Sequence, residues 1–270
     1  MKVNTETLPK ESSKNFTGII IEKMEQNQFK VEFIASTMLT PSVAELSFRR
    51  LDKLPFPFIP GQFITFLLPH PSGKIVPRSY SLANSASQTN QLDIAIAPVQ
   101  GGFATNILFN LKSGDLLDCV GPKGRLILQA AEKPTHYLLV ATGTGVAPYR
   151  SMLPTLAKRL EEDKKLKVTL LLGVRYASDL LYAEDFIAFS EKYPTFHFRG
   201  YLSRADAETA PYQYVGYVQS AFESLDLNPM TDLVYLCGNP YMIDESIEQL
   251  QNMGFNLQSI RREKYISRRV

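Results

Sequence analysis

A glycine-containing segment, Thr142-Gly143-Thr144-Gly145-Val146-Ala147-Pro148, follows a run of apolar residues and precedes a helical pattern. Glycine lets a backbone turn sharply and approach a ligand closely. Pro148 fits the first turn of a helix, where a missing N–H is no loss. The unpaired N–H groups at such a helix N-terminus attract phosphate. The segment therefore predicts a nucleotide-phosphate site, although it lacks the third glycine of the GxGxxG pattern, and a tight turn without a ligand is the alternative.

Two segments in the first half of the chain could hold a flat, anionic ligand. Arg78-Ser79-Tyr80-Ser81 begins a predicted strand, on which Arg78 and Tyr80 share one face. An arginine can bind an anionic group while a neighbouring aromatic ring stacks on a planar ligand. Gly101-Gly102-Phe103-Ala104-Thr105 opens a short predicted helix and is a second candidate phosphate cradle. A surface arginine beside a packed tyrosine, and a simple helix start, are the corresponding alternatives.

Cys237-Gly238-Asn239-Pro240 ends another predicted buried strand. Ligands of open α/β sheets bind outside the carboxyl ends of the strands. We therefore expect Cys237 near the ligand of the 142–148 segment, with a buried structural cysteine as the alternative.

The composition narrows the function classes. A length of 270 residues predicts two domains of about 100–150 residues. The net charge is only +2, from 29 basic and 27 acidic residues, so we expect no nucleic-acid partner. With two cysteines and three scattered histidines, the chain is not expected to bind a metal. No segment predicts a membrane span or a signal peptide, so we expect a cytoplasmic protein without a membrane partner.

The expected secondary structure changes near residues 129–134, from short strands to strands that alternate with helices. The first half predicts a small antiparallel barrel, because short strand-like runs alternate with turn residues. Its strands are expected at 30–35, 43–48, 62–68, 79–83, 92–97 and 116–120, with one helix at 103–111. The second half alternates buried strands with helices, which is typical of a doubly wound parallel sheet. Its strands are expected at 136–142, 168–174, 195–202 and 233–237, and its helices at 147–163, 184–192, 217–225 and 242–253.

These segments, RSYS at 78–81, GGFAT at 101–105, TGTGVAP at 142–148 and CGNP at 237–240, resemble in this order the motifs of the ferredoxin–NADP reductase family. Segment 114–128 also resembles the end of that family's barrel. The resemblance implies an antiparallel β-barrel domain that binds FAD, followed by an α/β doubly wound parallel-sheet domain that binds NADP(H). The expected limits are a mobile N-terminal extension at 1–28, the barrel domain at 29–132 and the α/β domain at 133–270.

The resemblance also implies a role for each motif residue. Arg78 would hold the FAD pyrophosphate, Tyr80 would stack on the flavin ring, and Ser81 would hydrogen-bond near flavin N5. The other expected FAD contacts are Ser79, Gly102, Phe103, Ala104 and Thr105. The expected dinucleotide contacts are Thr142, Gly143, Thr144, Gly145, Pro148, Cys237 and Gly238. The expected catalytic residues are Ser81, Cys237 and Tyr265, of which Tyr265 would stack on the flavin, with residues 266–270 near the adenine side of FAD.

The expected dinucleotide is NADPH, with NADH as the alternative. Arg175, Ser203 and Arg204 follow strand ends where NADP-using members of the family bind the 2′-phosphate. In contrast, Gly216-Tyr217-Val218 lacks the further arginine that many of those members carry.

The implied activity is hydride transfer between NADPH and flavin, with ferredoxin or flavodoxin as the redox partner. The alternatives are an NADH-dependent reductase component of an oxygenase system and a non-catalytic flavin-binding module. A basic cluster within residues 261–270 could attract an acidic redox partner or form a frayed, solvated end.

Overall fold

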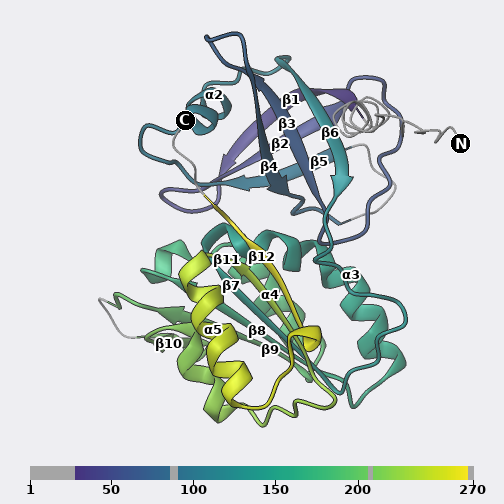
Figure 1. The fold of residues 1–270 in the computed structure, drawn as a ribbon, viewed down its shortest axis with the longest axis vertical. Helices are drawn as coiled ribbons and strands as arrows, with labels where there is room; N and C mark the ends of the chain where they lie inside the picture. The colour runs from purple at the N-terminus through teal and green to yellow at the C-terminus, as the bar shows by residue number, and fades with distance from the viewer. Residues whose placement is uncertain (1–27, 86–90, 206–208, 267–270) are drawn as a thin grey trace, which may run out of the picture.

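The computed structural model describes residues 28–85, 91–205 and 209–266, which form two six-stranded sheets (Figure 1). The first sheet is antiparallel, with strand order β4-β3-β6-β1-β2-β5. The second is parallel, with strand order β10-β9-β8-β7-β11-β12. The predicted fold class, an antiparallel barrel followed by a doubly wound α/β sheet, is confirmed. The predicted N-terminal extension lies outside the described residues, apart from Gln28.

The first sheet closes into a barrel around an apolar core. Its strands are β1 (Gln28–Met38), β2 (Ala44–Arg50), β3 (Phe63–Pro69), β4 (Ile75–Ser81), β5 (Gln91–Ile96) and β6 (Leu116–Lys123). Phe48, Ile64 and Phe66 are fully buried in this core. An isolated antiparallel bridge between Leu82 and Ile94 joins the continuation of β4 to β5, so the two ends of the sheet meet. Helix α2 (Phe103–Phe109) packs against the same core.

The second sheet places the strand with the longest buried run at its centre. Its strands are β7 (His136–Thr142), β8 (Lys167–Val174), β9 (Phe196–Leu202), β10 (Gln213–Val215), β11 (Leu233–Gly238) and β12 (Ile260–Lys264). Strand β7 is buried along most of its length between β8 and β11, as a continuous apolar run predicts. The helices are α3 (Ala147–Glu162), α4 (Ala183–Lys192) and α5 (Pro240–Asn252). Because the strand order reverses between β7 and β11, a ligand is expected at the carboxyl ends of these two strands.

Four elements differ from the sequence-based expectation. Arg78-Ser79-Tyr80-Ser81, expected to begin a strand at 79–83, instead ends strand β4. The segment expected to be an α-helix at 217–225 is a 3₁₀ helix, η3 (Val218–Ser224). Val218 and Ala221 are both buried, and a spacing of three places residues on one face of a 3₁₀ helix. Strands β10 and β12 were not predicted, because one has only three residues and the other reads Ile-Arg-Arg-Glu-Lys. Both lie at sheet edges, where polar side chains can face solvent.

The basic cluster near the C-terminus is therefore not a frayed end over 260–264. Strand β12 pairs with β11 along its whole length and runs up toward the barrel, as the yellow arrow in Figure 1 shows. Residues 267–270 lie outside the described part. Within the described ranges, no helix is long and apolar enough to cross a membrane.

Candidate functional site

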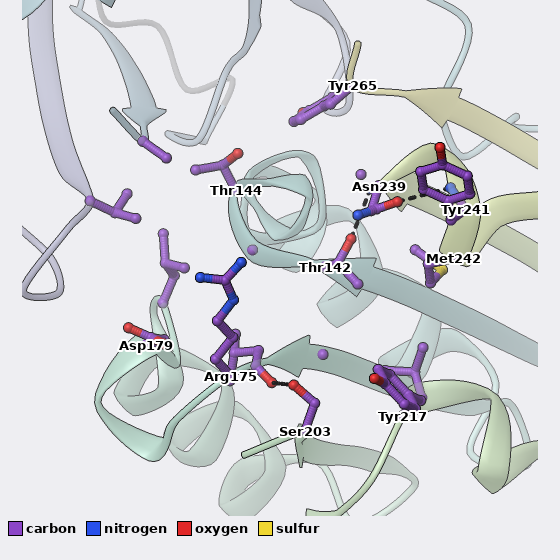
Figure 2. A pocket seen from close by; sticks show the side chains of 18 of the residues that line it. Thr142, Thr144, Arg175, Asp179, Ser203, Tyr217, Asn239, Tyr241, Met242 and Tyr265 are labelled. Atoms are coloured by element: carbon purple, nitrogen blue, oxygen red, sulfur yellow. Dashed lines mark hydrogen bonds between the residues drawn. The ribbon is translucent and has the colours of Figure 1, made fainter. Parts of the chain in front are cut away.

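Two cavities adjoin where the barrel meets the parallel sheet. The first has a volume of about 870 Å³ and opens at the carboxyl ends of β7, β8 and β11 (Figure 2); it is called the dinucleotide cavity after the ligand that the sequence predicts there. The second has a volume of about 660 Å³ and lies against β4, the start of α2 and the end of β12; it is called the flavin cavity after the ligand that the sequence predicts there. The residues that line both cavities are Ala97, Val99, Thr144 and Tyr265. Ligands in the two cavities would therefore meet at these four residues.

The flavin cavity collects all the residues predicted to bind FAD. Its lining includes Arg78, Ser79, Tyr80, Ser81, Gly102, Phe103, Ala104 and Thr105. The Tyr80 ring packs 5.8 Å from the Phe66 ring, and burial raises the pKa of Tyr80 to about 12, so its phenol stays neutral. No side chain caps the N-terminus of α2 at Gly102. An arginine, a helix start and a fixed aromatic ring in one cavity fit the pyrophosphate and the flat ring of FAD.

A hydrogen-bonded chain of three side chains lies at the edge of the flavin cavity. The Tyr265 hydroxyl donates to Ser81 Oγ at 2.6 Å, and Ser81 Oγ donates to Glu263 Oε1 at 3.1 Å. Burial raises the pKa of Glu263 above its ordinary value, and the bond from Ser81 offsets this only in part. The Glu263 carboxyl can therefore hold a proton beside Ser81 at a higher pH than an exposed carboxylate could.

Glu263 is a site residue that sequence reasoning missed. It lies two residues before Tyr265, and residues two apart share a face of an extended strand. Reading 260–265 as a strand would have paired these two side chains.

The turn after β7 packs across the end of β11 and forms one wall of the dinucleotide cavity. A Cβ atom on Gly145 would lie 2.5 Å from the Cys237 carbonyl oxygen, and one on Gly238 would lie 2.5 Å from Thr142 Oγ1. Gly238 also has φ +121°, which favours glycine. Thr142 Oγ1 accepts a hydrogen bond from the Asn239 N–H at 2.8 Å and joins the two strand ends. Glycine is therefore required on both sides of this crossing.

The dinucleotide cavity contains most, but not all, of the residues predicted for it. Of these, Thr142, Gly143, Thr144, Arg175, Ser203 and Gly238 line it. Figure 2 shows the Arg175 side chain pointing from the end of β8 into the cavity, toward Thr144. Arg204 is exposed and does not line the cavity.

Three further predicted contacts are buried beneath the cavity instead of lining it. Gly145 packs on the backbone of β11, and Pro148 is enclosed in the first turn of α3. Cys237 is fully buried, and its thiol is hydrogen-bonded to the Tyr265 side chain. Burial raises the pKa of this thiol well above its ordinary value, so it stays protonated. Cys237, expected as a dinucleotide contact and a catalytic residue, therefore does not line the cavity, because its thiol is buried against Tyr265.

Other residues of the dinucleotide cavity were not predicted. Tyr217 and Tyr241 are 72% and 80% exposed, and such solvent-facing rings at a cavity offer flat surfaces for a base. Asp179 brings a carboxylate to the same side as Arg175, as Figure 2 shows. Gln219 donates to Glu245 Oε2 at 2.8 Å, and both side chains belong to the lining. The only local sequence signal for these residues was a tyrosine, Tyr217, directly after Gly216.

Comparison with known proteins agrees with this division of the site. Family models match an oxidoreductase FAD-binding domain at residues 30–127 and an oxidoreductase NAD-binding domain at residues 139–247. Ferredoxin–NADP reductase B of Sorangium cellulosum is 34% identical over 192 residues, 71% of this chain and 76% of that protein. The toluate 1,2-dioxygenase electron transfer component of Pseudomonas putida is 28% identical over 244 residues, 90% of this chain and 69% of that protein. A crystal structure of a cytochrome P450 reductase from Amycolatopsis has a TM-score of 0.76 and 26% identity, covering 88% of this chain and 69% of that one.

Proposed function

The chain belongs to the ferredoxin–NADP reductase family of FAD- and NAD(P)-binding oxidoreductases, and we propose that it transfers electrons between NADPH and a ferredoxin or flavodoxin. We place its FAD domain at 29–132 and its dinucleotide domain at 133–270. Bound FAD would exchange a hydride with the nicotinamide and single electrons with the protein partner.

The observation that carries this proposal is the junction of the two cavities. Tyr265 and Thr144 line both, so a nicotinamide in one cavity can reach a flavin ring in the other. Holding two rings in contact lowers the barrier for transfer between them, because orientation is fixed before reaction.

We propose the following roles for the residues around the flavin. Arg78 and the first turn of α2 bind the FAD pyrophosphate, and Tyr80 stacks on the ring. Tyr265 would lie against the flavin ring where the two cavities adjoin. Ser81 and Glu263 hold a proton near the position where the hydride is exchanged. Cys237 acts beneath the site, through its contact with Tyr265, and does not touch the ligand.

On the dinucleotide side, we propose that the turn at 142–145 binds the pyrophosphate and that Tyr217 stacks on the adenine. Arg175 and Ser203 would bind the 2′-phosphate of NADPH. The test is anaerobic mixing of the purified yellow protein with each dinucleotide, followed by addition of a ferredoxin or a flavodoxin. We expect NADPH to bleach the flavin absorbance and either partner to restore it. A protein that takes up no FAD, or a flavin that neither dinucleotide reduces, would refute the proposal.

A second candidate is an NADH-dependent reductase component of an oxygenase system. Three observations favour it. Asp179 places a negative charge in the cavity beside Arg175, and Arg204 does not line the cavity, which leaves Arg175 as the one arginine among the described lining residues for a 2′-phosphate. The 28%-identical relative is an electron transfer component of a dioxygenase. A kcat/KM for NADH that exceeds the value for NADPH would decide for this candidate.

A further inference from the structure

A cluster of polar side chains connects the two halves of the molecule outside both cavities. This interdomain cluster consists of Glu45 on β2, Arg150 on α3, Tyr182 before α4 and Asp185 on α4. Arg150 Nε donates to Asp185 Oδ2 at 2.6 Å, and its Nη1 donates to Glu45 Oε2 at 3.4 Å. The Tyr182 hydroxyl donates to the same Glu45 oxygen at 2.8 Å. The Arg150 guanidinium also lies over the Tyr182 ring, 4.3 Å from its centroid.

The contacts across the domain boundary are partly shielded from water. The Glu45 and Arg150 side chains are 18% and 28% exposed. Arg150 Nη1 also donates to the Ala83 carbonyl at 3.4 Å, so one arginine contacts two segments of the barrel. Burial raises the pKa of Glu45, while the bond from Tyr182 and the charge of Arg150 act against this rise. Removal of Arg150 would leave Glu45 beside Asp185 and Asp93 without its cation, which favours separation of the domains.

Three residues of the interdomain cluster lie within three positions of a residue that lines a cavity. Val43, the residue directly before β2, lines the dinucleotide cavity two residues before Glu45. Leu181 lines the same cavity directly before the tyrosine. Ala147 lines the flavin cavity one turn before the arginine, at the start of the helix that follows the phosphate turn. A shift at the cluster would therefore move the dinucleotide cavity relative to the barrel.

We propose that Arg150 is a positioning residue, which fixes the phosphate turn against the barrel and so sets the approach of the nicotinamide to the flavin. The inference rests on the proposed function. Arg150 lines neither cavity, so it acts through the placement of α3. Misplacement by about 1 Å can lower a rate by about 100-fold, because the reacting atoms leave their productive geometry.

The kinetic test uses Arg150→Met, which keeps an apolar stem and removes all four contacts. We expect the limiting rate of flavin reduction at saturating dinucleotide to fall by about tenfold or more, with FAD content and dinucleotide affinity nearly unchanged. Glu45→Gln retains an oxygen that can accept from Tyr182 and Arg150, so it should keep most of the rate that Glu45→Ala loses. Lys158→Met removes an exposed cation from the same helix and is the matched control.

The second test measures the domain arrangement without any turnover. Both natural cysteines are buried, so cysteines introduced at exposed Lys74 in the barrel and Glu191 in α4 can be spin-labelled selectively. Pulsed electron paramagnetic resonance should show a broadened or shifted distance distribution in Arg150→Met and an unchanged one in Lys158→Met.

An unchanged distance distribution in Arg150→Met, or a rate per bound flavin equal to that of the unsubstituted protein, would overturn the proposal. If Arg150→Met does not fold, Glu45→Ala combined with Tyr182→Phe removes the Glu45 contacts, leaves only the bond from Arg150 to the Ala83 carbonyl, and receives the same two measurements. A flavin that neither dinucleotide reduces would refute the proposed function instead, and the distance measurement would still test the positioning.

Discussion

Substitution of Gly145 by alanine tests the crossing between the phosphate turn and β11. The added Cβ would lie 2.5 Å from the Cys237 carbonyl oxygen and 2.9 Å from Gly238 Cα, and both are backbone atoms that cannot rotate away. Overpacking of this kind destabilises a protein by about 3 kcal/mol. For a domain of this size, that loss lowers Tm by roughly 6–12 °C.

Gly143 provides a matched comparison two residues earlier. It has φ +51°, but no atom lies within 4 Å of an added Cβ. Alanine there meets only the left-handed backbone penalty, about 1 kcal/mol, so Tm should fall by roughly 2–4 °C. Its methyl group would enter the dinucleotide cavity and weaken dinucleotide binding more than it weakens the fold.

Differential scanning calorimetry of the two FAD-loaded variants gives the Tm values, and fluorescence titration gives the dinucleotide affinities. We expect Gly145→Ala to be the less stable variant, even though only Gly143 has a positive φ. If Gly143→Ala unfolds at the lower temperature, or if Gly145→Ala has the Tm of the unsubstituted protein, the close contact between Gly145 and β11 is not what requires glycine at position 145.

Three further predictions concern binding and pH. Arg78→Ala should weaken FAD binding by about tenfold or more, because a charge-assisted hydrogen bond is lost; flavin retained per chain after gel filtration measures this, and full retention would contradict the assigned role. Arg175→Ala should lower the ratio of kcat/KM for NADPH to that for NADH by about tenfold, since this side chain is exposed and its charge is screened; an unchanged ratio would exclude Arg175 as a 2′-phosphate ligand. Burial lowers the pKa of His136 below 6.5, so the unfolded chain takes up a proton first as the pH falls, and the free energy of unfolding should decrease below about pH 6.5. His136→Gln should flatten that decrease in denaturant titrations, and an equally steep decrease in the variant would show that other groups cause it.

Local sequence patterns were sufficient for the central elements. The strand expected at 136–142 was found with the same limits, because an uninterrupted apolar run is stable only where both faces are covered. The Gly-Gly turn and the RSYS segment were found in one cavity, the first directly before α2 and the second at the end of β4.

The remaining parts depend on contacts between distant parts of the chain. Glu263 reaches Ser81 across 182 positions, and no local pattern encodes that distance. The strand that carries it is mostly charged, so its apolar signal is weak. Arg175 and Arg204 both follow strand ends, but only Arg175 lines the cavity. The sequence places residues at the end of a strand, whereas the direction of each side chain depends on the turn that follows.

Strand β12 has a consequence for recombination between relatives. It is hydrogen-bonded into the sheet of the second domain, yet it delivers Glu263 and Tyr265 to the flavin cavity of the first. A chimera joined at residues 129–134 would pair one parent's flavin cavity with the other parent's Glu263 and Tyr265. The flavin environment would then depend on the parent that supplies the last residues of the chain as much as on the parent that supplies the barrel.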